Sequence, residues 1–202
     1  SYFGSKEGEW KFYHKNGNIQ EISYFNHGVY VNESKQFYPS GKKMIQSFFY
    51  LGKKDSAYTS FFENGRVAET GQYDKGTKVG VWEYWYVDSS LRKIAKYNSL
   101  GEEHVGSFWN KNKVQTIQNG QGEKVSYYEN GNIKESYRYK DSLLNGEMKL
   151  LKATGKPMAT GNYVQGKKHG EWVTYFLLTD QISTRKTFDA DFVVWMDTIK
   201  ES

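Results

Sequence analysis

The sequence predicts an all-β protein, an elongated, twisted single-layer antiparallel β-meander of about eight β-hairpin repeats, each near 24 residues long. Two observations predict this fold class. A turn-forming doublet recurs along the chain, and a fixed period of this length is the signature of a repeat architecture. Aromatic residues make up 17% of the chain and only two prolines occur, a composition that favours strands.

The turns divide the chain into repeats. With the second residue of each doublet as position zero, the doublets are spaced 24 residues apart, except for one step of 18 residues. Position zero is occupied by Gly17, Gly41, Gly65, Ser89, Lys113, Gly131, Gly155 and Thr179. Three doublets read Asn-Gly, and here we expect two-residue type I′ loops, which need positive φ at both residues. The array spans residues 1–190, with an abbreviated unit near 113–131.

A two-residue loop also fixes which residues lie opposite each other on the two strands. Large side chains then face small ones in four hairpins: Trp10 with Ser23, Tyr58 with Gly71, Trp82 with Ala95, and Met148 with Gly161. Glycines face aromatic residues two positions farther out: Gly8 with Phe25, Gly80 with Tyr97, Gly122 with Tyr139, and Gly146 with Tyr163. Nearer the turn the expected pairs are Phe62 with Val67, Tyr86 with Leu91, and Tyr128 with Ile133. These pairs share one parity, so they define a packed face.

A second set of rings has the opposite parity and points to the other face of the sheet. It occupies position −4 and forms a candidate binding ladder: Tyr13, Phe37, Phe61, Trp85, Trp109, Tyr127 and Tyr175. One interpretation is that the rings cover the sheet and shield its hydrogen bonds. The other is that they bind a peptide, a sugar or a lipid.

Residues 191–202 form the expected C-terminal cap of the array, because both ends of a repeat array must be closed. The segment 192–196 is the most apolar pentad of the chain. It is consistent with either a last strand or a short helix.

The net charge of +5 and the pI of about 9.0 indicate either a solvated surface or a preference for anionic partners. Six lysines in or beside the connections between hairpins are candidates for contact with phosphates or acidic lipids: Lys53, Lys54, Lys75, Lys78, Lys167 and Lys168. Asp55, Asp74 and Asp141 interrupt this stripe, which favours a role in solubility. Nucleic-acid binding is disfavoured, because most rings face small or apolar partners rather than basic ones.

Catalytic and metal-binding motifs are missing from the sequence. There is no cysteine, and the four histidines have no metal-ligand spacing. We therefore expect no enzyme activity, no metal and no cofactor. No apolar run approaches the ~20 residues that span a bilayer. The start without methionine and the lack of cysteine slightly favour an exported or cell-envelope location in a bacterium.

Two segments resemble the variant MORN repeat, a family whose bacterial members include YwqK-type antitoxins. They are residues 167–175, which end in Glu-Trp-Val-Thr-Tyr, and residues 127–135, which contain the Asn-Gly turn. The resemblance implies a non-enzymatic repeat scaffold that binds a protein partner, with an antitoxin-like role as one form of it. The alternative is a cell-envelope module that binds lipid headgroups or glycan through its aromatic and lysine-rich surfaces.

Overall fold

The computed structural model describes residues 4–199, and within this range every regular element is a β-strand. The strands belong to one antiparallel sheet. They are β1 (Gly8–Tyr13), β2 (Ile19–Asn26), β3 (Val29–Phe37), β4 (Lys43–Tyr50), β5 (Lys53–Phe61), β6 (Val67–Asp74), β7 (Thr77–Trp85), β8 (Leu91–Tyr97), β9 (Glu103–Trp109), β10 (Gln115–Gln118), β11 (Gln121–Tyr127), β12 (Ile133–Lys140), β13 (Leu143–Leu151), β14 (Pro157–Val164), β15 (Lys167–Tyr175), β16 (Ile182–Asp189) and β17 (Phe192–Thr198).

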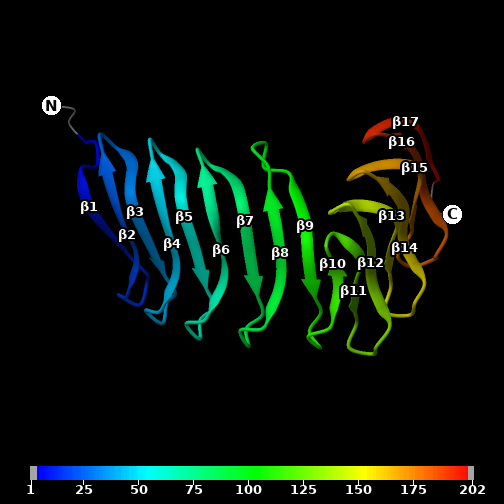
Figure 1. Cartoon of the computed structure of the whole chain (residues 1–202), viewed down its shortest axis with the longest axis horizontal. Coiled ribbons are helices and arrows are strands. Elements are labelled where there is room, and N and C mark those ends of the chain that lie inside the picture. The colour runs from blue at the N-terminus through cyan, green and yellow to red at the C-terminus, as the bar shows by residue number, and fades with distance from the viewer. Residues whose placement is uncertain (1–3, 200–202) are drawn as a thin grey trace. The chain divides into compact units, whose positions relative to one another are not determined.

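The chain forms two compact units, Ser1–His104 and Val105–Ser202. In the first unit, consecutive strands from β1 to β8 pair with each other in chain order (Figure 1). In the second unit, the same holds from β9 to β17. Each unit is therefore a meander of hairpins, and the predicted fold class is confirmed.

The Asn-Gly turns are three-residue loops, and the prediction of two-residue type I′ loops is wrong. At the first turn, the Gly17 N–H donates to the His14 carbonyl at 2.9 Å, and the His14 N–H donates to the Asn18 carbonyl at 2.8 Å. Gly17 has a φ of 85°, whereas Asn16 is not in the left-handed region. This geometry is a type I turn followed by a left-handed residue in a G1 bulge.

Two-residue loops occur instead at the opposite edge of the sheet, where one hairpin connects to the next. His27 and Gly28 have φ values of 50° and 82°, and Lys75 and Gly76 have values of 48° and 94°. Positive φ at both loop residues defines the type I′ turn. Most connections at this edge use the same loop, but the one between β8 and β9 is a three-residue loop in which the Gly101 N–H donates to the Asn98 carbonyl at 3.0 Å.

A β-bulge explains why the predicted register still holds away from the turn. In the first hairpin Tyr13 pairs with Ile19, but Phe12 pairs with Glu21, so Gln20 is an extra residue on β2. The three-residue loop shifts the pairing by one residue, and the bulge shifts it back. All eight outer pairs are confirmed, among them Trp82 with Ala95.

Between the loop and the bulge, the pairing differs by one residue from the prediction. The expected pairs Phe62–Val67, Tyr86–Leu91 and Tyr128–Ile133 are wrong. The observed pairs are Phe61–Val67, Trp85–Leu91 and Tyr127–Ile133. The last turn is a four-residue loop, one residue longer than the three-residue loops, because the Phe176 N–H donates to the Gln181 carbonyl at 2.8 Å and Asp180, with a φ of 61°, takes the left-handed position assigned to Thr179.

The interior of each unit is a thin layer of side chains on the packed face. In the first unit Tyr58, Trp82 and Tyr84 form a buried cluster. In the second, the buried cluster lies around the abbreviated unit and is made of Val105, Phe108 and Ile117. The fold therefore relies on rings packed over a single sheet rather than on a second layer.

The apolar pentad of the expected cap lies in β17, an edge strand that pairs with β16, so of the two conformations left open the strand is correct. Its side chains are exposed, with Phe192 at 75% and Trp195 at 50%. Residues 200–202 of the expected cap lie outside the described residues.

Candidate binding surfaces

The ring ladder lies on the face opposite the packed face, because position −4 alternates with the buried position −5 along the same strand. Five of the seven rings face aliphatic side chains across the hairpin, as Trp85 does with Leu91. The other two face polar residues, Phe37 opposite Lys43 and Trp109 opposite Gln115. Neighbouring copies within a unit are two strands apart, or roughly 9.6 Å at ~4.8 Å per strand. The five hairpins with an aliphatic partner each contribute one apolar patch to this face. Val67, Leu91 and Ile133, which were expected on the packed face, belong to this ladder face instead.

The ladder rings are only partly covered. Tyr13 and Tyr127 are each 58% exposed, and the other five rings are half-buried. One lysine adds to the surface, since the Lys43 ammonium lies 5.5 Å from the centre of the Phe61 ring. Four ladder residues lie in the first unit and three in the second. The exposed parts of the ladder rings are accessible from solvent.

The packed face is built around tryptophans that lie over glycine. Trp82 is fully buried, and its indole N–H donates to the Gln72 carbonyl at 3.2 Å. Trp172 in the second unit makes the same bond to Asn162 at 3.2 Å. Tyr73 packs edge-on against Trp82 with ring centres 5.2 Å apart. The repeated geometry shows that position −7 serves packing.

Lysines cover these rings on the solvent side. The Lys78 ammonium lies 3.7 Å from the centre of the Trp82 ring, and the Lys168 ammonium lies 4.6 Å from that of Trp172. Lys54 lies 4.7 Å from the Tyr58 ring, and burial lowers its pKa. Cation–π contacts of this kind are worth about 0.5–2 kcal/mol.

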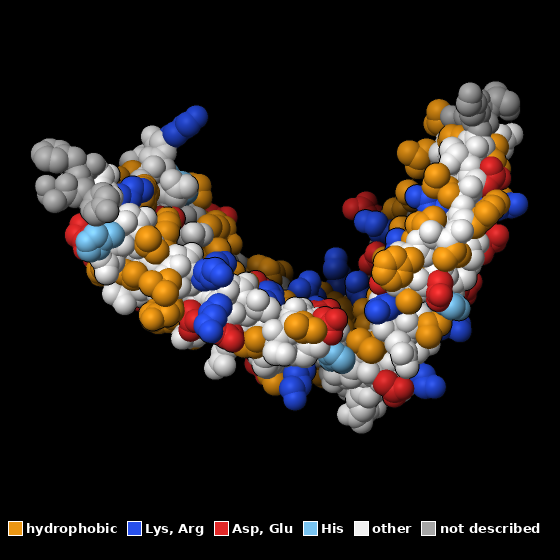
Figure 2. Space-filling view, turned by 90° about the horizontal axis from the view of Figure 1, so that it is seen from above, with side chains coloured by type: hydrophobic (Ala, Val, Ile, Leu, Met, Phe, Trp, Pro, Cys, Tyr) orange, Lys and Arg blue, Asp and Glu red, His pale blue; other side chains and the backbone are white. Residues whose placement is uncertain are grey.

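The six candidate lysines therefore divide into two groups. Lys54, Lys78 and Lys168 are half-buried over rings of the packed face, whereas Lys53, Lys75 and Lys167 are exposed. Figure 2 looks down on the upper edge of Figure 1, and in this view basic, acidic and hydrophobic side chains are interspersed. Within each unit, the candidate lysines therefore do not form one continuous basic stripe.

A charged network that no sequence pattern indicated also lies on the packed face of the first unit. The Lys93 ammonium lies 2.6 Å from the Glu103 carboxylate, which also accepts a hydrogen bond from the Tyr97 hydroxyl. Burial alone would raise the pKa of Glu103, but hydrogen bonds from Lys93 and Tyr97 hold it below its usual value. Burial and the neighbouring carboxylate raise the pKa of Tyr97. The groups are paired with each other, which fits a structural role.

Asparagines of three turns connect one hairpin to the next. The Asn16 and Asn18 side-chain amides both donate to the Pro39 carbonyl at 2.8 Å. Asn64 likewise donates to the Val87 carbonyl at 3.1 Å, and Asn130 to Ala153 at 2.8 Å. We call these bonds the turn clamps. They give the Asn of the Asn-Gly doublet a role that the sequence interpretation missed.

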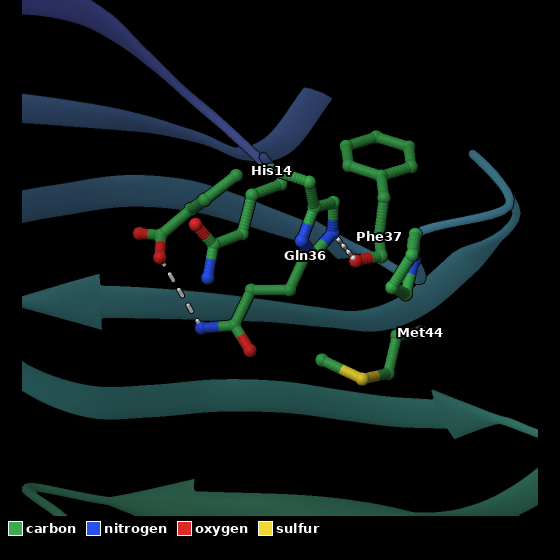
Figure 3. A pocket seen from close by; sticks show the side chains of 7 residues that line it. His14, Gln36, Phe37 and Met44 are labelled. Atoms are coloured by element: carbon green, nitrogen blue, oxygen red, sulfur yellow. Dashed lines mark hydrogen bonds between the residues drawn. The ribbon is translucent and has the colours of Figure 1, made fainter. Parts of the chain in front are cut away.

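A pocket of about 160 Å³ opens beside the first turn clamp. Figure 3 shows His14, Gln36, Phe37 and Met44 around this space; Glu21, Gln20 and Pro39 complete its lining. The His14 Nε2 donates to the Phe37 carbonyl at 2.9 Å. No sequence pattern pointed to this site.

Two further properties bear on chemistry. Within residues 4–199, no three histidine, aspartate or glutamate side chains are grouped as metal ligands. The same range contains no helix that is long and apolar enough to cross a membrane.

Two hairpins of the chain are similar to a known repeat family. Two segments of the chain match the MORN repeat variant. They are residues 6–27, which comprise the first hairpin, and residues 120–141, which comprise the hairpin of β11 and β12. The match indicates a MORN-type repeat scaffold for interactions. No curated protein sequence matches the chain.

Among solved structures, the chain is similar to part of one described as the crystal structure of TcdB2-TccC3-Cdc42. The identity is 10% and the TM-score 0.25 over 89% of this chain. The chain spans only 11% of that chain's length.

Proposed function

We propose that the MORN-type array is a non-enzymatic scaffold that docks a protein partner on the ladder face. The observation that carries this proposal is the partly exposed ring at position −4, which recurs in seven hairpins and lies beside an aliphatic residue in five of them. Aromatic residues are enriched in protein interfaces because they bury much area with few rotatable bonds. A finer form of the proposal is an antitoxin-like inhibitor, which would hold its target on this face.

A pull-down from the source cell tests the proposal. The bait is the full chain, compared with the double variant Phe61→Ser/Trp85→Ser and with the control Tyr50→Ser. Tyr50 is 62% exposed but lies at the connecting edge, away from the ladder. Circular dichroism melting verifies that each variant is folded.

We expect a specific partner to be recovered by the native chain and by Tyr50→Ser, and to be lost with the double variant. Recovery of the same proteins by all three baits would contradict docking on the ladder. An antitoxin-like role further requires that the partner's own activity falls on adding the native chain.

The alternative, a cell-envelope module that binds lipid headgroups or glycan, rests on the exposed lysines Lys53, Lys75 and Lys167. It is weakened by the engagement of the other three lysines over rings. Sedimentation with anionic vesicles or with glycan, using Lys→Glu changes at the three exposed positions, distinguishes it from the leading proposal. Salt-sensitive binding that these changes remove would favour the alternative.

A further inference from the structure

The pocket beside the first turn contains a carboxylate that has no lysine or arginine partner within residues 4–199, unlike its counterparts in other repeats. Glu21 occupies position +4, as do Glu69 and Glu135. Glu69 lies 3.5 Å from the Lys78 ammonium, and Glu135 lies 3.5 Å from that of Lys124. Among the described residues, no such ion pair forms at Glu21.

The reason lies in two substitutions within the repeat pattern. The position of Lys78 is held by Tyr30 in the repeat that follows Glu21, and the position of Lys124 is held by Trp10 in its own repeat. At both repeat positions from which a lysine contacts the carboxylate in other repeats, an aromatic residue is thus present here. A partly buried carboxylate without a counterion is unfavourable unless a cation arrives from outside.

The hydrogen bonds of Glu21 leave one oxygen largely available. Its Oε1 accepts from the Ser23 hydroxyl at 2.5 Å and from the Tyr30 hydroxyl at 3.0 Å. From the part of the chain that the structure describes, its Oε2 accepts only a long bond, 3.5 Å, from the Gln36 amide. A carboxylate oxygen accepts two hydrogen bonds, so Oε2 has capacity for a further donor.

The rest of the lining suits a flat cation on an alkyl stem. Because the His14 Nε2 donates to a carbonyl, Nδ1 of a neutral ring is an acceptor. The side chains of Met44 and Pro39 add apolar walls. The volume of about 160 Å³ is several times the ~30 Å³ that one water occupies in the liquid.

We propose that this pocket binds the alkylguanidinium group of an arginine side chain carried by a protein. A guanidinium is planar, presents a fork of N–H donors and is more weakly hydrated than an ammonium, so it matches the available Oε2 and the apolar walls. The Glu21 carboxylate of the pocket lies on the packed face, and Phe37 is the one lining residue that the pocket shares with the ladder. This inference uses the proposed function only for the source of the arginine, and its test needs no partner.

The test is an NMR titration of the full ¹⁵N-labelled chain with Nα-acetyl-L-arginine amide. We expect saturable shifts at the amides of residues 14, 21 and 36, and at least tenfold weaker binding for the uncharged analogue Nα-acetyl-L-citrulline amide. Nα-acetyl-L-lysine amide should also bind more weakly. Equal binding of arginine and citrulline derivatives, or no shifts at these amides, would overturn the proposal.

Matched variants locate the effect. Glu21→Gln should weaken arginine binding at least tenfold, whereas Glu69→Gln, at the same repeat position but paired with Lys78, should leave it unchanged. An equal loss in both variants would contradict the site. Met44→Trp is a second variant for the case in which Glu21→Gln impairs folding. It fills the pocket while leaving the Glu21 carboxylate in place, and it should abolish binding.

Two more probes separate the sources of the guanidinium. The blocked tripeptide acetyl-Gly-Arg-Gly-amide represents a polypeptide, and free L-arginine and agmatine represent metabolites. Tighter binding of the tripeptide supports a protein-borne arginine. Tighter binding of the free compounds would overturn that assignment. Failure of every probe would leave the ladder pull-down unaffected, so the two proposals can fail separately.

Discussion

The Trp82 indole lies directly against the backbone of Gly71 on the neighbouring strand. A Cβ placed on Gly71 would lie 2.2 Å from the Trp82 Cδ2 atom, which is far inside van der Waals contact. Gly161 and Trp172 repeat this relationship in the second unit, also at 2.2 Å. A glycine is required here for space, since neither Gly71 nor Gly161 has a positive φ.

Replacement of this glycine should therefore destabilise the first unit. We expect Gly71→Ala to lower the free energy of unfolding by about 1–3 kcal/mol, the range for an overpacked core. Chemical denaturation followed by tryptophan fluorescence measures the change. In the background of Trp82→Leu the same substitution should have a much smaller effect. An equal loss in both backgrounds would show that the indole is not the cause.

The turn clamp gives a second prediction. Asn64→Ala should lower the unfolding free energy by about 1–2 kcal/mol, because it removes the bond to the Val87 carbonyl and a bond from the Arg66 N–H within the turn. Asn64→Asp keeps the acceptor for the Arg66 N–H and removes only the clamp. Its unfolding free energy should therefore lie between those of the native chain and of Asn64→Ala. Asn112→Ala, at the same repeat position, serves as control because no clamp is formed by its side chain; a loss as large as that of Asn64→Ala would contradict the clamp. Thermal unfolding of the four proteins decides the order.

Lysines of the connecting edge should differ in their effect on stability. Lys78→Met loses the cation over Trp82 and the ion pair with Glu69, so we expect a loss of about 0.5–2 kcal/mol. Lys75→Met, at an exposed side chain, should stay within about 0.5 kcal/mol of the native chain. Urea denaturation compares them. Equal losses of unfolding free energy in the two variants would mean that placing a lysine over the Trp82 ring adds no stability.

Alkaline pH should destabilise the first unit through Tyr58. Burial raises the pKa of Tyr58 from 10.0 to about 12. A group whose pKa is raised on folding contributes stability below its unfolded pKa and loses that contribution as pH rises through its folded pKa. We therefore expect the unfolding free energy to fall between pH 10 and pH 12, and less so in Tyr58→Phe. Absorbance of tyrosinate against pH should show one late-titrating group in the native chain that the variant lacks.

The sequence predicted the strands and the outer register correctly, although it assigned the wrong loop to the turns. The pairing of Trp82 with Ala95 depends only on the net offset between strands, and a three-residue loop with a compensating bulge has the same net offset as a two-residue loop. Asn-Gly is compatible with both turn types, so the doublet alone cannot separate them. The inner pairs, such as Phe61 with Val67, lie between loop and bulge and depend on the difference.

The candidate surfaces were predictable to different degrees. Strand parity placed the ladder rings on one face, because alternation is a local property of each strand. The division between Lys53 and Lys54 is also a matter of parity. The pocket at Glu21 could not be foreseen, since it arises where Tyr30 and Trp10 replace the lysines that reach Glu69 and Glu135. Only a comparison of equivalent positions across repeats reveals it.

The turn clamps run in one direction, from the asparagine of one hairpin to the carbonyl of the following one. They join the first hairpin to the second, the third to the fourth and the sixth to the seventh, so among the described residues no hairpin both gives and receives a clamp. The clamps therefore group hairpins into pairs, and a pair could be duplicated or exchanged with its internal clamp intact. The array can lengthen or shorten by such pairs during evolution without losing the bond that ties each pair together.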